Sequence, residues 1–146
     1  MEKNYKKLLI TLSISFAIMY SVMFLNVASV DHVYFSLTRV YMALLMISPM
    51  ALLMLLSMKN MYKNKKLNKI FVVVSICVFV LSLFFLRNQT FISDEQYMKA
   101  MIPHHSSAIL TSENANIEDP GVKNLSEEII VAQEQEIDLM KNILAQ

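Results

Sequence analysis

The sequence predicts an all-α membrane protein, in which three transmembrane helices precede an extracytoplasmic α-helical hairpin. The chain has 146 residues, of which 55% are hydrophobic, and its mean hydropathy of +0.46 is high for a soluble protein. Three long apolar runs fall within residues 1–93, which hold ten of the thirteen basic residues. Residues 94–146 hold ten of the twelve acidic residues. This division indicates a basic membrane part followed by an acidic, water-facing part.

The three apolar runs are expected to cross a bilayer at about residues 8–30, 40–58 and 70–86. A hydrocarbon core of about 30 Å needs roughly 20 apolar residues, so the third run is at the short end. Pro49 inside the second run is tolerated, because neighbouring helices satisfy the carbonyl that it frees. The first run is too long for the core of a signal peptide and has two more spans behind it, which favours an uncleaved anchor. We therefore expect a membrane domain over residues 1–90.

Basic residues predict how this domain is oriented in a cell membrane. Eight lysines lie before the first run or between the second and third, whereas only Arg39 and Arg87 flank the opposite ends. Positive residues concentrate on the cytoplasmic side of membrane proteins. We therefore expect a multi-pass protein with a cytoplasmic N-terminus and an extracytoplasmic segment after Arg87.

The first helix of the expected hairpin begins with a capping motif. Ser93 followed by Gln96 has the S-x-x-Q spacing of a capping box, in which each residue hydrogen-bonds the other's backbone. The helix is expected from Asp94 towards Asn114, with a bend at Pro103.

The second helix is expected from Pro120 to about Ala145, with Asp119 as its N-cap and proline in its first turn. Two helices of this length bury little surface by themselves. The hairpin, residues 91–146, is therefore expected to pair with a second copy into a four-helix bundle, or to lean on an extension of the third span.

Helical periodicity gathers polar residues on the inner faces of both helices. The second helix has an apolar arc that also contains Glu136, and the first places Ser106 on the outer side. The arc is formed by Val122, Leu125, Ile129, Ile137, Met140 and Leu144. A buried carboxylate or imidazole is costly unless it is paired. Mutual hydrogen bonding or a metal ion would both meet that need.

Imidazole and thioether together suit a soft or borderline metal ion, copper above all. The candidate metal ligands on the facing sides are Asp94, Met98, Met101, His104, His105, Glu136 and Met140. For Glu136, together with Gln133, a structural hydrogen-bond network across the dimer is at least as good an interpretation as direct ligation.

The pattern D-x-x-Y-x-x-x-M-I-P-H-H-x-x-A-I from Asp94 is followed by Asp119-Pro120 and by I-I-x-x-Q-x-x-E-I-x-x-M from Ile129. This set resembles the domain of unknown function 305 family over about residues 94–144. The resemblance implies a ferritin-like helical bundle of the kind that bacteria export or anchor in membranes. Some family members bind copper and are tied to copper or silver tolerance. It implies a metal-binding role for Met101, His104, His105 and Met140, with Met98 as a further candidate.

Enzymatic functions find little support in the sequence. Glu-x-x-His repeats, His-Glu-x-x-His and a nucleophile elbow are all absent. Gly121 is the only glycine, which excludes a phosphate-cradling loop, and the acidic C-terminal part argues against nucleic acid. We expect a non-enzymatic protein that binds or buffers copper, or silver, outside the membrane. The alternatives are a non-metal module that assembles with another membrane protein, and a ligand-binding sensor.

Two further features have a simpler interpretation than metal transport. Five methionines at a spacing of four in the second run could pass Cu(I), but methionine also fills gaps between helices, and packing is the expected role. They are Met42, Met46, Met50, Met54 and Met58. His32, beside Asp31 in the outer loop, could extend the metal site, but we expect it to be solvent-exposed.

Overall fold

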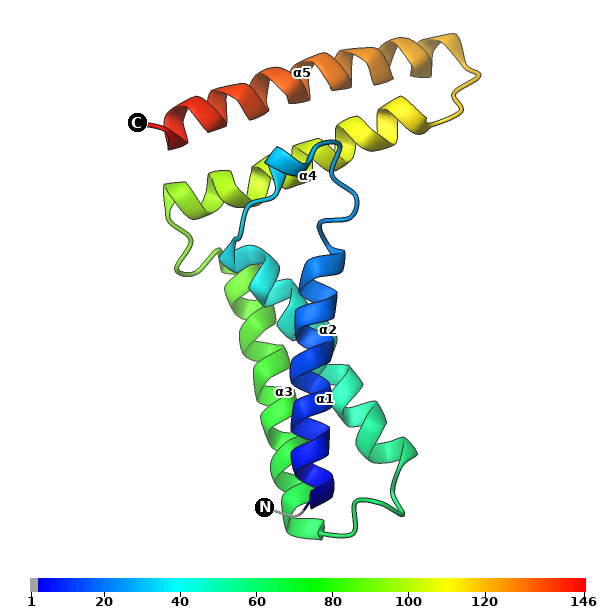
Figure 1. Ribbon diagram of the computed structural model, residues 1–146, viewed down its shortest axis with the longest axis vertical. Coiled ribbons are helices and arrows are strands. Elements are labelled where there is room, and N and C mark those ends of the chain that lie inside the picture. Colours follow the sequence, from blue (N-terminus) through cyan, green and yellow to red (C-terminus); the bar gives the residue numbers. More distant parts are fainter. Residues whose placement is uncertain (1–2) are drawn as a thin grey trace. The chain divides into compact units, whose positions relative to one another are not determined.

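The computed structural model describes residues 3–146, and over that range the chain is all-α, without strands. Figure 1 shows the helices. Their bounds are α1 Lys3–Val22, the 3-10 turn η1 Val30–His32, α2 Leu37–Ser57, α3 Lys65–Asn88, α4 Asp94–Asn114 and α5 Pro120–Leu144. The chain forms two compact units. One comprises Met1–Val22 and Thr38–Phe91, and the other Met23–Leu37 and Ile92–Gln146.

The first unit contains α1, α2 and α3, which are all long and apolar enough to cross a membrane. The ranges of α2 and α3 include the predicted runs 40–58 and 70–86 to within one residue. The predicted run 8–30 differs, because α1 begins at Lys3 and ends at Val22. Residues 23–37 instead belong to the second unit, although the sequence alone assigned them to the membrane domain.

A polar network at the N-terminal end of α1 holds the first unit together. The Tyr5 hydroxyl donates to Asn68 Oδ1 at 2.7 Å and accepts from the backbone N–H of Asn64 at 3.2 Å. The Asn4 amide donates to the Met61 carbonyl at 3.0 Å. Tyr5 and Tyr62 are buried in the adjoining apolar cluster. These contacts join α1 to the α2–α3 connection and to the first turn of α3.

The methionines of α2 divide into two groups. Met54 packs against the buried cluster around Tyr5 and Met50 is partly buried, whereas Met42 and Met46 are exposed on α2 and Met58 is exposed just after its end. The methionines at this spacing therefore do not all face one packed interface.

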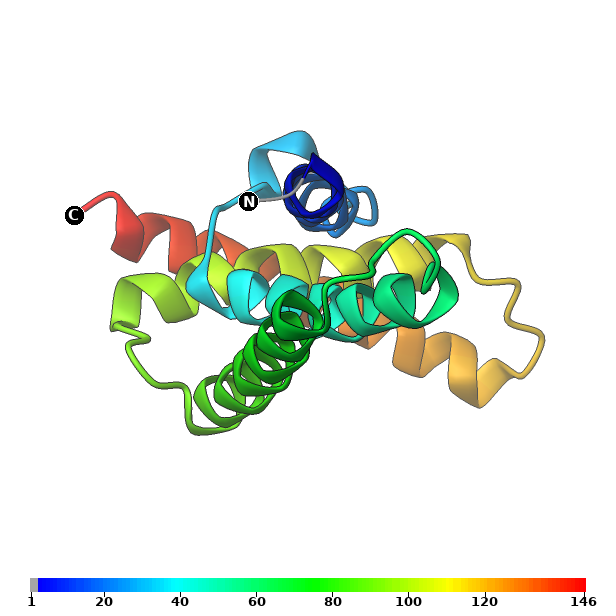
Figure 2. The same cartoon turned by 90° about the horizontal axis from the view of Figure 1, so that it is seen from below.

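The second unit is built on α4 and α5, which lie side by side in both views (Figures 1 and 2). The bounds of α4 match the prediction, and α5 ends one residue earlier than expected. Ser93 Oγ accepts from the Gln96 N–H at 3.4 Å, as a capping residue does. The Gln96 side chain accepts from the Leu37 N–H at 2.9 Å, so only half of the predicted capping box forms. α4 continues as a helix through Pro103.

The core between α4 and α5 is a buried cluster of Ile102, Ile109 and Ile137. Met140 and Leu144 pack against it, as the predicted arc requires. The N-terminal part of that arc is different, because Val122 and Leu125 are about half exposed. The helix turns Ile130 and Ile137 towards α4, and Ile129 is only partly buried.

Candidate functional site

His105 of α4 and Glu136 of α5 form the closest contact between predicted site residues. His105 Nε2 lies 2.6 Å from Glu136 Oε2, and the two side chains are 12% and 56% exposed. Ile102 and Ile109 pack on Ile137, which brings the intervening turn of α4 against Glu136. A carboxylate only accepts hydrogen bonds, so the imidazole donates its Nε2 proton. Within one chain, Glu136 thus accepts a hydrogen bond from His105.

The second ring nitrogen of His105 has no partner. Its Nδ1 is buried and makes no hydrogen bond to any described residue. When Nε2 carries the proton, Nδ1 of the neutral ring holds a lone pair. An unpaired polar atom of this kind costs about 1–3 kcal/mol. Metal-binding histidines have the same arrangement, with one nitrogen donating to a carboxylate and the other free for the metal.

The other predicted ligands are less closely associated with this pair. The ring of His104 lies 6.0 Å from that of His105, between centroids, and is solvent-exposed. Met98 and Met101 are partly buried, and Met140 packs against the isoleucine core. Asp94 is exposed in the first turn of α4.

Within residues 3–146, no three or more His, Cys, Asp or Glu side chains come close enough to hold a metal ion together. Of the predicted set, the single chain therefore joins one imidazole to one carboxylate, with a second imidazole adjacent. Thioethers of nearby methionines are the remaining soft donors.

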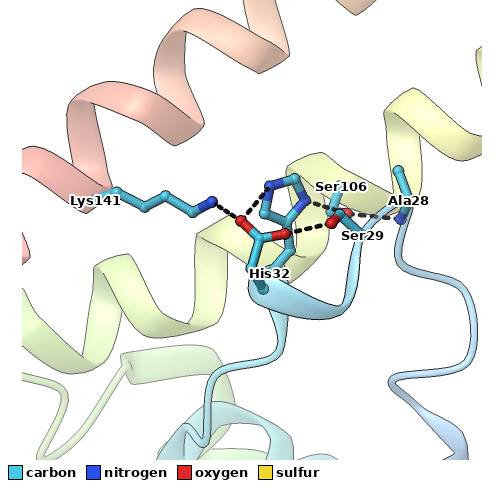
Figure 3. A network of polar contacts seen from close by, with 6 residues as sticks. Ala28, Ser29, His32, Ser106 and Lys141 are labelled. Carbon is cyan, nitrogen blue, oxygen red and sulfur yellow. Dashed lines mark hydrogen bonds and ion pairs between the residues drawn. The ribbon is translucent and has the colours of Figure 1, made fainter.

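A second polar cluster, which the sequence did not reveal, docks the segment 23–37 on α4 (Figure 3). Ser106 is fully buried, and its Oγ accepts from the Ala28 N–H at 2.8 Å. The same oxygen lies 2.8 Å from His32 Nδ1. The expectation that Ser106 faces outward is wrong, because the docked segment covers that side of α4.

Asp31 links the same segment to α5. Its carboxylate hydrogen-bonds Ser29 Oγ and Lys141 Nζ and lies 3.7 Å from His32 Nε2. The Lys141 hydrogen bond, and then that of Ser29, hold the pKa of Asp31 well below its usual range. Burial, followed by the charge of Lys141, lowers the pKa of His32 despite the opposing charges of Asp31 and Asp138.

The expectation that His32 is solvent-exposed is also wrong, because its side chain is only 14% exposed. Further contacts fix the segment on both sides of η1. The Asn26 amide donates to Ser107 Oγ at 2.7 Å, and Leu37 N–H donates to Gln96. No local sequence motif predicts these contacts, because they join residues that are 59 to 110 positions apart in the chain.

The comparisons with known proteins cover both units. The model of the family "Domain of unknown function (DUF305)" matches residues 82–144, and so includes α4, α5 and the end of α3. An uncharacterized protein of Acanthamoeba polyphaga mimivirus is 33% identical over 144 residues, which cover 97% of this chain and 93% of the relative. The chain belongs to the same family as that viral protein.

This DUF305 match confirms the resemblance seen in the sequence and extends it to the end of α3. The viral relative aligns along the first unit as well as the hairpin, so the two parts occur together in both proteins. No solved structure matches this chain.

Proposed function

We propose that this protein is a membrane-anchored metal-binding protein that binds or buffers copper, or silver, at the α4–α5 hairpin. The observation that carries the proposal is the His105 imidazole, which donates from Nε2 to Glu136 and keeps a buried, unpaired Nδ1. Glu136 then orients the imidazole, and Nδ1 is the donor atom for the metal.

The neighbouring side chains supply a suitable set of further donors. His104 is exposed beside His105, and Met101 lies one helical turn before it. Imidazole with thioether favours copper over hard cations such as Mg²⁺, which prefer oxygen ligands. Met98 extends the thioether set by another turn, whereas Met140 already packs in the core.

The proposed location is the extracytoplasmic side of a cell membrane. Eight lysines lie at one end of the membrane unit, in the first turns of α1 and between residues 59 and 69. The positive-inside rule assigns that end to the cytoplasm. Three spanning helices would then carry the hairpin to the opposite side.

A second candidate function is a non-metal module that assembles with another membrane protein. It is favoured by the absence of any close group of three His, Cys, Asp or Glu side chains among residues 3–146. The exposed apolar side chains of α5 would then serve protein contacts alone.

Metal titration of the full chain in detergent micelles or nanodiscs separates the two candidates. The metal proposal predicts saturable Cu(I) binding that is lost in the double variant His104→Ala/His105→Ala. Glu136→Gln should weaken binding by about 10–100-fold, because the carboxylate orients the ligand. His32→Gln is the matched control and should bind as the wild type does. Equal binding by the double variant, or no binding by the wild type, would remove the metal proposal.

A further inference from the structure

α5 carries a second apolar stripe that α4 does not cover. Its members follow one another at spacings of four, three, four, three and four residues. They are Leu125, Ile129, Ala132, Glu136, Leu139 and Ile143. Leu125, Leu139 and Ile143 are 54%, 60% and 46% exposed. Glu136 is the only charged member.

This spacing is the heptad repeat by which one helix packs along another. At about 100° per residue, the stripe lies roughly 110° around α5 from the side that holds Ile130 and Ile137 against α4. In a four-helix bundle each helix has two neighbours on adjacent sides. α4 is therefore one neighbour of α5, and the stripe has the geometry of a contact with a second.

The stripe is complementary to itself. Its spacing reads the same in both directions about residue 134, so two antiparallel copies of α5 place every member opposite another. Leu125 then meets the partner's Ile143, and Ile129 meets the partner's Leu139. Each apolar side chain then meets another apolar side chain, and Glu136 meets the small Ala132, which is the self-complementarity that a two-fold interface between identical chains requires.

Charge favours the antiparallel arrangement over the parallel one. In a parallel pair, Glu136 would lie opposite the same carboxylate of the partner, and like charges in close contact repel. In the antiparallel pair, Glu136 lies opposite Ala132, the smallest side chain of the stripe. That arrangement leaves room for the carboxylate beside its hydrogen bond to His105.

We infer that a second copy of this chain docks antiparallel along the α5 stripe, with residue 134 at the two-fold axis. The dimer would bury the exposed leucines and isoleucine of the stripe.

The pairing also has a consequence for the metal site, which rests on the proposed function. Ala132 and Glu136 are one turn apart, about 6 Å along the helix. In the dimer, the His105–Glu136 pair of one chain therefore lies about one helical turn from the same pair of the other chain. The dimer would then hold two such sites close together, one from each chain.

Cysteine cross-linking of the full chain tests the pairing directly. Cys77 is free and exposed on α3, so it is first replaced by serine. Leu125→Cys and Ile143→Cys chains carrying different tags are then mixed in detergent with a chelator and oxidised. We expect the mixed disulfide to form several-fold faster than the disulfide between two Leu125→Cys chains.

Val131→Cys is the matched control, because Val131 is also 54% exposed on α5 but lies off the stripe. It should cross-link slowly in every mixture. Fast linking between two Leu125→Cys chains would show a parallel pair, and rates at the Val131→Cys level throughout would show that the stripe does not dimerise. Either result overturns the inference.

The chelated conditions keep this test separate from the metal proposal. Fast mixed linking by a chain that binds no copper would leave the dimer standing and remove the proposed function. Copper binding by a chain that does not form the mixed disulfide would support the metal proposal and overturn the dimer.

Discussion

Ser106 and Ser107 are adjacent residues of α4 with very different surroundings. Ser106 is fully buried, accepts a hydrogen bond from the Ala28 N–H and lies within hydrogen-bond distance of His32 Nδ1. Ser107 accepts a hydrogen bond from the exposed Asn26 amide. Ser106→Ala should leave two partly buried polar groups unpaired. We expect the free energy of unfolding of the second unit to fall by about 1–3 kcal/mol, as measured by chemical denaturation.

Ser107→Ala is the control for that experiment. Ser107→Ala removes only the exposed hydrogen bond from Asn26, which water can replace, so the expected loss is smaller, at about 0.5 kcal/mol or less. Equal losses in the two variants would mean that the docked segment 23–37 does not depend on Ser106.

His32 should make the docked segment sensitive to pH. Its pKa is lowered in the folded protein, chiefly by burial, whereas an unfolded histidine titrates near about 6.5. As the pH falls below that value, the unfolded chain takes up the proton first, and the folded state loses stability. Asp31 contributes no slope there, because its own pKa lies far below this window.

The measurement is the thermal midpoint of the wild type and of His32→Gln between about pH 7.5 and about pH 5.5. The wild type should lose more stability over this interval than the variant. Parallel curves for the two proteins would show that His32 does not titrate with unfolding.

At the scale of elements, helix caps explain why the hairpin could be predicted well. Asp119 Oδ1 accepts from the Val122 N–H at 2.9 Å, and Pro120 follows in the first turn. Asp119→Ala should lower the stability of the second unit by about 1 kcal/mol. Glu118→Ala, one residue before the cap, should change the stability little. A loss of stability equal to that of Asp119→Ala would show that the Asp119 cap is not what stabilises α5.

The sequence predicts α4 and α5 because capping residues and prolines act locally. The sequence also predicts that His105 and Glu136 face each other, because helical periodicity places them on the inner sides of α4 and α5. It fails for the end of α1, since Met23, Phe24 and Leu25 are as apolar as the helix before them. The helix ends at Val22, and the segment after it docks on α4 through Asn26 and Ala28, by contacts that leave no local pattern.

At the scale of the whole molecule, a unit of three helices long and apolar enough to span a membrane is followed by the hairpin unit. Its orientation is a prediction from charge. A phosphatase that is active only outside the cytoplasm, fused after Gln146, should be active, whereas the same enzyme inserted after Asn60 should be inactive. The reverse pattern would place the hairpin in the cytoplasm and would leave copper buffering outside the membrane without support.

The central claim is that His105 Nδ1 is a metal ligand. Nitrogen-15 NMR of the histidine-labelled full chain, followed during addition of Ag(I) as a diamagnetic substitute for Cu(I), tests it most directly. We expect a large shift of the His105 Nδ1 resonance. Nε2 should keep its proton and its hydrogen bond to Glu136, and the His32 ring resonances should not change. An unchanged His105 ring at saturating silver would contradict the account.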